Sequence, residues 1–111
     1  MSQILADNAS QLNYLAWTIV DPRGKWKQGD YALAVQAAER AVKLLEGKDA
    51  STMDTLGLAL FKAGQVERAI EVQEKAVALA KGVKELKELE AELRGRLDEF
   101  KNASKTAKKG L

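Results

Sequence analysis

Residues 49–81 read DASTMDTLGLALFKAGQVERAIEVQEKAVALAK, and this stretch decides the fold of the chain. In its first half, large and small apolar residues recur every three or four positions, as they do along one face of a helix. Asp49 or Ser51 can cap its start. The second half repeats the apolar spacing and places charged residues on the opposite side. Gly64 lies between the halves, where glycine takes the left-handed conformation that ends a helix. The stretch therefore predicts two short helices joined by a turn.

The same pattern occurs once more, earlier in the chain. LAVQAAERAVKLL at residues 33–45 aligns with RAIEVQEKAVALA at residues 68–80 at an offset of 35 residues. The helices that precede these segments align at an offset of 41, so the first unit has a longer internal loop. An internal repeat of this length is typical of helical hairpins that stack side by side and share one core.

These two units resemble the tetratricopeptide repeat family. The resemblance is carried by a leucine and a small residue in each first helix, and by two alanines in each second helix, where small side chains allow close packing. These residues are Leu15-Ala16, Leu56-Gly57, Ala34, Ala41, Ala69 and Ala76. The chain departs from the family pattern at Gln73, where a large apolar residue is usual, and at Lys81, which replaces a common proline. The resemblance covers residues 9–81. It implies an all-α fold of antiparallel helical hairpins stacked as a short right-handed solenoid of about five helices.

We expect five segments along the chain. A partly ordered lead-in at residues 1–7 precedes a first hairpin at 8–46, whose long internal loop spans residues 21–30. A second hairpin at 49–81 is followed by a helix at 83–101 and a disordered basic tail at 102–111. The narrow apolar stripe and charged flanks of the last helix predict a cap with one side on the solenoid and the other in water. A short coiled coil is the alternative interpretation.

The family resemblance implies a non-catalytic module that presents a concave groove, lined by the first helices, to a peptide or a partner protein. Carried over by position, the groove residues are Ser10, Asn13, Trp17, Ser51, Asp54, Leu58, Phe61 and Lys62. Leu58 and Phe61 can instead contact the terminal helix, and a helix that filled the groove would exclude any peptide. Tyr14 shares a face with Trp17, and this aromatic pair either covers the neighbouring helix or the long loop, or faces a ligand.

Two other functions remain open. The long loop contains Arg23, Lys25, Trp26 and Lys27, a secondary contact surface that, together with the basic tail, could serve a nucleic-acid accessory role. Alternatively, Leu86, Leu93 and Phe100 on the terminal helix could pair between chains and make the protein a homo-oligomer. Of these two, the net charge of +2 argues against nucleic acid.

The composition excludes most catalytic chemistry. The chain has no cysteine and no histidine, which removes thiolate nucleophiles, the commonest general base and the commonest transition-metal ligands. No phosphate-binding loop or nucleophile motif is present, so we predict no catalytic residue, no metal site, no cofactor and no small-molecule substrate. No apolar run is long enough to cross a membrane, and the first six residues do not form a signal peptide.

A narrower resemblance concerns the larger protein. LNYLAWTIVDP at residues 12–22, a polar loop, and the repeats at 33–80 together look like the C-terminal repeat region of bacterial thioredoxin-like fusion proteins. In that case the redox chemistry belongs to another domain. The compartment stays open: cytoplasmic, or periplasmic if the segment comes from an exported fusion.

Overall fold

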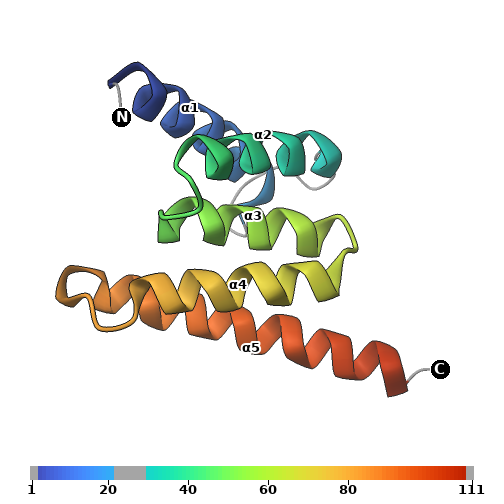
Figure 1. The fold of residues 1–111 in the computed structure, drawn as a ribbon. Helices are drawn as coiled ribbons and strands as arrows, with labels where there is room; N and C mark the ends of the chain where they lie inside the picture. Colours follow the sequence, from blue (N-terminus) through green and yellow to red (C-terminus); the bar gives the residue numbers. More distant parts are fainter. Residues whose placement is uncertain (1–2, 22–29, 110–111) are drawn as a thin grey trace.

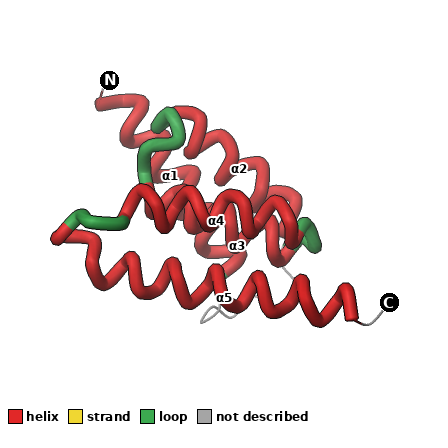
Figure 2. Tube along the Cα trace, turned by 60° about the horizontal axis from the view of Figure 1, so that its bottom comes forward, coloured by secondary structure: helices red, strands yellow, loops and turns green. Residues whose placement is uncertain are grey.

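The computed structural model describes residues 3–21 and 30–109, which form five α-helices and one short 3-10 turn (Figure 1). Consecutive helices run antiparallel, and none of the described residues lies in a strand (Figure 2). The predicted all-α architecture of stacked helical hairpins is confirmed. The elements are α1 (Gln3–Val20), α2 (Tyr31–Leu44), α3 (Ala50–Lys62), α4 (Val66–Ala80), η1 (Lys84–Leu86) and α5 (Lys87–Lys109).

Aspartate side chains cap the starts of two helices. The carboxylate of Asp30 accepts a hydrogen bond of 3.0 Å from the backbone N–H of Leu33 at the start of α2. Asp49 does the same for Thr52 at the start of α3, at 2.9 Å. Each bond satisfies a backbone donor that has no partner inside its helix. Of the two candidates for the start of α3, Asp49 is therefore the cap and Ser51 is the second residue of the helix.

The turn between α3 and α4 is built around Gly64, as the sequence predicts. Gly64 has a φ of +89°, a backbone conformation that residues with a side chain rarely adopt. The backbone N–H of Gln65 donates to the carbonyl of Leu60 at 2.8 Å, and that of Gly64 donates to Phe61 at 3.0 Å. This pair of bonds is the Schellman arrangement, and it reverses the chain with only three residues between the helices.

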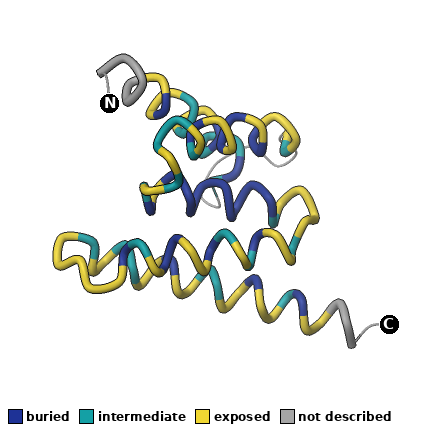
Figure 3. The backbone as a smooth tube through the Cα atoms, in the orientation of Figure 1, coloured by how far each residue is buried: buried dark blue, intermediate teal, exposed yellow. Residues whose placement is uncertain are grey.

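Helix α3 lies at the centre of the stack and is buried along most of its length (Figure 3). It packs on α1 and α2 on one side and on α4 and α5 on the other. Helix α5 packs mainly on α4 and supplies one buried residue to each of the two hydrophobic clusters, Phe100 to the first and Leu93 to the second. The chain therefore stacks as two hairpins followed by a single helix.

The structure differs from the expected ends of the chain. Helix α1 begins at Gln3, so residues 3–7 of the partly ordered lead-in are helical. The predicted disordered tail at 102–111 is wrong for residues 102–109, because α5 continues to Lys109. Ser104 anchors this part of the helix: the residue is only 8% exposed, and its hydroxyl donates to Glu67 on α4 at 2.7 Å. Leu15, one of the residues that carry the family resemblance, is 43% exposed.

Candidate functional site

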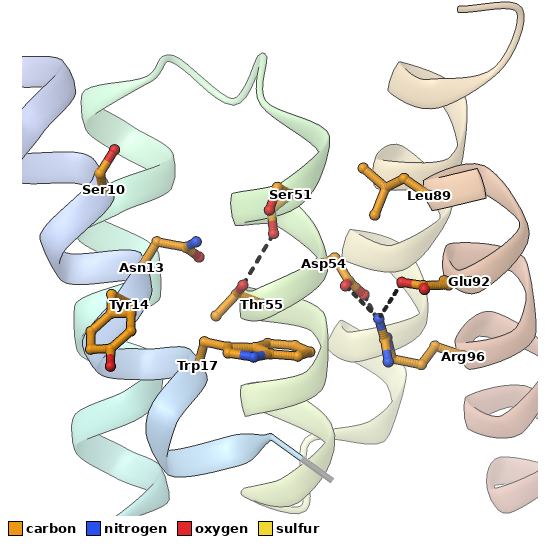
Figure 4. Close-up of a pocket in the computed structure, with 10 residues that line it drawn as sticks. All are labelled: Ser10, Asn13, Tyr14, Trp17, Ser51, Asp54, Thr55, Leu89, Glu92 and Arg96. Atoms are coloured by element: carbon orange, nitrogen blue, oxygen red, sulfur yellow. Dashed lines mark hydrogen bonds and ion pairs between the residues drawn. The ribbon is translucent and has the colours of Figure 1, made fainter. Parts of the chain in front are cut away.

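One face of the stack carries a groove of about 370 Å³ between α1, α3 and α5 (Figure 4). Each helix contributes residues spaced three or four positions apart, which places them on the same side of that helix. Helix α5 forms one wall of the groove and does not fill it. The lining residues, which define the groove from here on, are Ser10, Asn13, Tyr14, Trp17, Ser51, Asp54, Thr55, Leu89, Glu92 and Arg96.

Five of the eight residues predicted for the partner-binding face lie together in this groove. Ser10, Asn13 and Trp17 come from α1, while Ser51 and Asp54 come from α3. They meet because α1 and α3 occupy equivalent places in their hairpins and lie next to each other in the stack.

The other three predicted residues lie elsewhere. Leu58 is 3% exposed and belongs to the hydrophobic core, so it has almost no surface for a partner. Phe61 stacks on Phe100 of α5, with ring centroids 4.5 Å apart. Phe61 therefore follows the alternative interpretation, in which it contacts the terminal helix. Lys62 lines a separate hollow beside Tyr31 on α2.

An ion pair between α3 and α5 forms the floor of the groove. The guanidinium of Arg96 donates from Nε to Oδ1 of Asp54 and from Nη2 to Oδ2, both at 2.8 Å. The Asp54 side chain is 6% exposed and that of Arg96 is 17% exposed. Gln73 on α4 also donates to Asp54 Oδ1, at 2.8 Å, and to the backbone carbonyl of Leu93 at 3.2 Å. These bonds join α3, α4 and α5 through buried polar groups.

The ion pair also favours the cationic form of Arg96. Burial alone lowers the pKa of an arginine side chain, but the hydrogen bond and charge of Asp54, with smaller contributions from Glu92 and Glu99, outweigh it. The pKa of Arg96 is therefore raised above its usual value, so the side chain stays a cation. Glu92 lies 3.9 Å from the guanidinium, and its side chain is 69% exposed at the rim of the groove.

Trp17 connects α1 to this network. The guanidinium carbon of Arg96 lies 5.5 Å from the centroid of the Trp17 ring, within the range of a cation–π contact. Figure 4 shows the ring crossing from α1 toward Arg96 beneath Asp54 and Thr55. Trp17 thus covers a neighbouring helix and lines the groove at the same time. Tyr14 is 74% exposed.

Sequence reasoning missed the contribution of α5 to the groove. Arg96 follows Leu93 by three positions and precedes Phe100 by four, so it lies in register with the buried stripe. A charged residue at such a position is the sequence signal for a buried ion pair, because buried arginines are almost always paired. The sequence instead favours Glu92 as its partner by i,i+4 spacing, and that contact is the longer one.

Other predicted contact residues are not part of the groove. Arg23, Lys25, Trp26 and Lys27 lie outside the described residues. Leu93 and Phe100, predicted to pair between chains, have no exposed surface, and Leu86 is partly buried against α4 and α5. Pairing through these residues would require α5 to leave its place in the stack. Within residues 3–21 and 30–109, no helix is long and apolar enough to cross a membrane.

Comparison with known proteins gives one match. Residues 50–83 match the family model described as tetratricopeptide repeat. This range contains α3, the turn at Gly64 and α4, the hairpin that contributes Ser51 and Asp54 to the groove. The searches of curated proteins and of solved structures returned no match. Residues 50–83 are therefore a tetratricopeptide-type repeat within an all-α helical fold.

Proposed function

We propose that this chain is a non-catalytic protein-interaction module whose groove binds an extended segment of a partner protein. Repeats of this type generally mediate contacts between proteins. The observation that carries the proposal is that three helices, α1, α3 and α5, contribute side chains to one open groove. In this proposal α5 takes the place that the first helix of a further repeat would occupy, so it extends the groove by a third helix.

We also infer that the first hairpin is a second repeat of the same type. Ala16, Ala34 and Ala41 match Gly57, Ala69 and Ala76 by position, and the three alanines have no exposed surface. Small residues at these places let α1 and α2 approach closely, as α3 and α4 do. Two stacked repeats place Asn13 and Asp54 at equivalent positions on neighbouring helices.

The groove offers hydrogen-bonding and aromatic groups to a peptide. Asn13 Oδ1 is buried and has no hydrogen-bond partner among the described residues, so a backbone N–H of a bound segment would satisfy it. Tyr14 provides an exposed aromatic surface, and Glu92 provides an exposed carboxylate. Asp54 and Arg96 bind each other, so in this proposal their role is to fix the position of α5.

Selection from a displayed peptide library tests this proposal. Peptides are selected on the wild-type chain and their affinities are then measured for Asn13→Leu and Glu92→Lys. Loss of a hydrogen bond or charge contact at the groove is expected to weaken binding about tenfold, which corresponds to about 1.4 kcal/mol. Lys75→Glu is the control, since Lys75 is exposed on α4 and lies outside the groove.

Lys62→Glu is a further variant. It tests whether the selected peptides bind in the hollow beside Tyr31 instead of the groove. Selected peptides that bind all four variants equally would count against the groove as the binding site.

The nucleic-acid alternative stays a prediction. Measuring nucleic-acid binding at low salt tests it, because phosphate-driven affinity is greatest there. The resemblance to thioredoxin-like fusion proteins also stays a prediction, and the sequence flanking this segment tests it.

A further inference from the structure

The charged side chains of the groove gather toward α5. The charged lining residues are Asp54 on α3 and Glu92 and Arg96 on α5, whereas the lining residues of α1 are uncharged. Figure 4 shows Asn13 and Tyr14 on one side of the groove and Glu92 on the other. The two ends of the groove therefore offer different chemistry to a bound segment.

Carboxylates outnumber cations at the α5 end. The guanidinium of Arg96 binds both oxygens of Asp54 at 2.8 Å, so these two charges largely cancel. Glu92 lies farther from the same guanidinium, at 3.9 Å, and its side chain is 69% exposed. Glu99, also exposed on α5, interacts with Arg96 through its charge. This end of the groove thus has an excess of negative charge, although the whole chain carries a net charge of +2.

An anionic side chain would not suit this end. Arg96 is the lining cation, and its Nε and Nη2 are already bound to Asp54. An anion would have to displace Asp54 or lie beside Glu92, and either arrangement places like charges together. At physiological ionic strength, charges more than about 8 Å away are largely screened. The nearby carboxylates therefore outweigh the positive charge carried elsewhere on the chain.

The groove also presents hydrogen-bond acceptors that lack donors. Asn13 Oδ1 is buried and has no partner among the described residues. The terminal torsion of an asparagine is soft, so a small rotation can present this oxygen to a donor in the groove. The Thr55 hydroxyl already donates to the backbone carbonyl of Ser51 at 3.1 Å, which leaves it its lone pairs. An ionised Glu92 only accepts, whereas lysine and arginine side chains only donate.

We propose that the segment bound in the groove carries a lysine or arginine side chain at the α5 end, beside Glu92, while one of its backbone N–H groups donates to Asn13 at the α1 end. The inference rests on the proposed function, because it names the chemistry of the partner for the same groove.

The helix spacing sets the distance between these two contacts along the segment. Helix α3 contacts both α1 and α5 and lies between them (Figure 1). Packed helices lie about 8–10 Å apart, so α1 and α5 are about 16–20 Å apart. An extended segment advances about 3.3 Å per residue, so about five or six residues separate the N–H at Asn13 from the basic side chain.

Charge reversal on both partners tests the basic side chain. Peptides selected on the wild-type chain from the displayed library are expected to share one lysine or arginine position. Glu92→Gln is expected to weaken their binding about threefold, as for an exposed ion pair, and Glu92→Lys about tenfold, because repulsion is added. A peptide whose basic residue is replaced by glutamate is expected to prefer the Glu92→Lys chain to the wild type.

Asp98→Lys is the matched control for this series. Asp98 is exposed on the same helix, lies outside the groove, and its variant changes the net charge by the same amount as Glu92→Lys. It is expected to bind the selected peptides within about twofold of the wild type, because its charge is distant and screened. Circular dichroism shows whether each variant keeps its helices.

Backbone methylation of the peptide locates the second contact. Replacing single N–H groups by N-methyl along one selected peptide is expected to reveal one position that weakens binding about tenfold. The same change is expected to cost much less with Asn13→Leu, since a double-mutant cycle isolates the contact between the two groups. The sensitive position should lie about five or six residues from the basic side chain.

The outcomes separate this inference from the proposed function. Peptides that Asn13→Leu weakens, but that share no basic position or bind Glu92→Lys as tightly as the wild type, would overturn the inference and leave the groove as the binding site. A sensitive N–H next to the basic residue would also overturn it. If neither Asn13→Leu nor Glu92→Lys weakens any selected peptide, the proposed function fails, and the inference fails with it.

Discussion

Arg96 holds both carboxylate oxygens of Asp54, 42 residues earlier in the chain, at 2.8 Å each. The two planar groups meet side by side, which is the strongest geometry for an arginine and a carboxylate. Because Asp54 lies on α3 and Arg96 on α5, the pair fixes the terminal helix against the second hairpin. Gln73 completes the arrangement from α4. The polar contacts that shape the groove are therefore also contacts that hold the fold together.

Removal of one partner of this pair is expected to be strongly destabilising. Arg96→Gln leaves the carboxylate of Asp54 buried without its cation, which costs about 3 kcal/mol of unfolding free energy. Urea denaturation measures this change. The double variant Asp54→Asn, Arg96→Gln is expected to lose less than the sum of the two single variants, because it leaves no buried charge.

Arg94→Gln is the matched control on the same helix. Arg94 pairs with Glu90 at 2.7 Å, but its side chain is 51% exposed. An exposed pair of this kind contributes about 0–1 kcal/mol, so the control is expected to lose little. Equal losses for the Arg94 and Arg96 variants would show that burial does not determine the strength of the Asp54 contact.

The pH dependence of the pair distinguishes arginine from lysine. A cation whose pKa is raised by folding contributes its stability below the unfolded pKa and loses it as pH rises through the folded pKa. Folding raises the pKa of Arg96 above its already high usual value, so the wild type keeps the contribution at moderately alkaline pH. Lysine has an unfolded pKa of about 10.4. We expect Arg96→Lys to lose stability relative to the wild type as pH rises above this value, and denaturation series at increasing pH to measure the difference. A constant difference would contradict the expected titration.

Two helical glycines are expected to respond oppositely to alanine. A Cβ at Gly57 would collide with Oε1 of Gln73, a side chain that is fully buried and held by Asp54 and Leu93. Gly57→Ala is therefore expected to lower the unfolding free energy by about 1–3 kcal/mol. Gly95 has no atoms near the same position, so Gly95→Ala is expected to stabilise α5 by up to about 1 kcal/mol. Thermal denaturation of both variants gives the signs, and a stabilising Gly57→Ala would refute the close contact.

The last turns of α5 contribute to stability through Ser104. Its hydroxyl donates to Glu67 on α4 at 2.7 Å, so Ser104→Ala is expected to cost about 1 kcal/mol. Thr106→Ala is the control, because the Thr106 hydroxyl is exposed and bonds only within its own helix, to the carbonyl of Asn102. Urea denaturation compares the two. A tail that did not pack on α4 would give the same small effect for both changes.

The elements with strong local signals could be predicted from the sequence. Asp30, Asp49 and Gly64 mark helix ends by their own chemistry, and each lies at a helix end in the structure. The spacing of small and large residues predicts the hairpins. At Gly57, for example, a residue without a side chain is required because the Gln73 side chain lies against the backbone there. These features depend on neighbours within one hairpin.

The features that depend on α5 could not be predicted. The distance between Asp54 and Arg96 along the chain exceeds the range of any local pattern, and spacing alone favours Glu92 as the partner. The helical tail has the composition of a solvated segment, and it is ordered because Ser104 reaches α4. Leu15 has the spacing of a core residue, since it corresponds to Leu56 on α3, but it is 43% exposed.

The position of Trp17 against Arg96 gives the chain an intrinsic optical reporter. The emission of an indole depends on the charges and water around it, and here a cation carried by α5 lies over a ring carried by α1. In a Trp26→Phe background, the emission of Trp17 would report detachment of the terminal helix directly. The same signal would respond to a segment entering the groove, so occupancy and helix release could be followed in solution without any added dye.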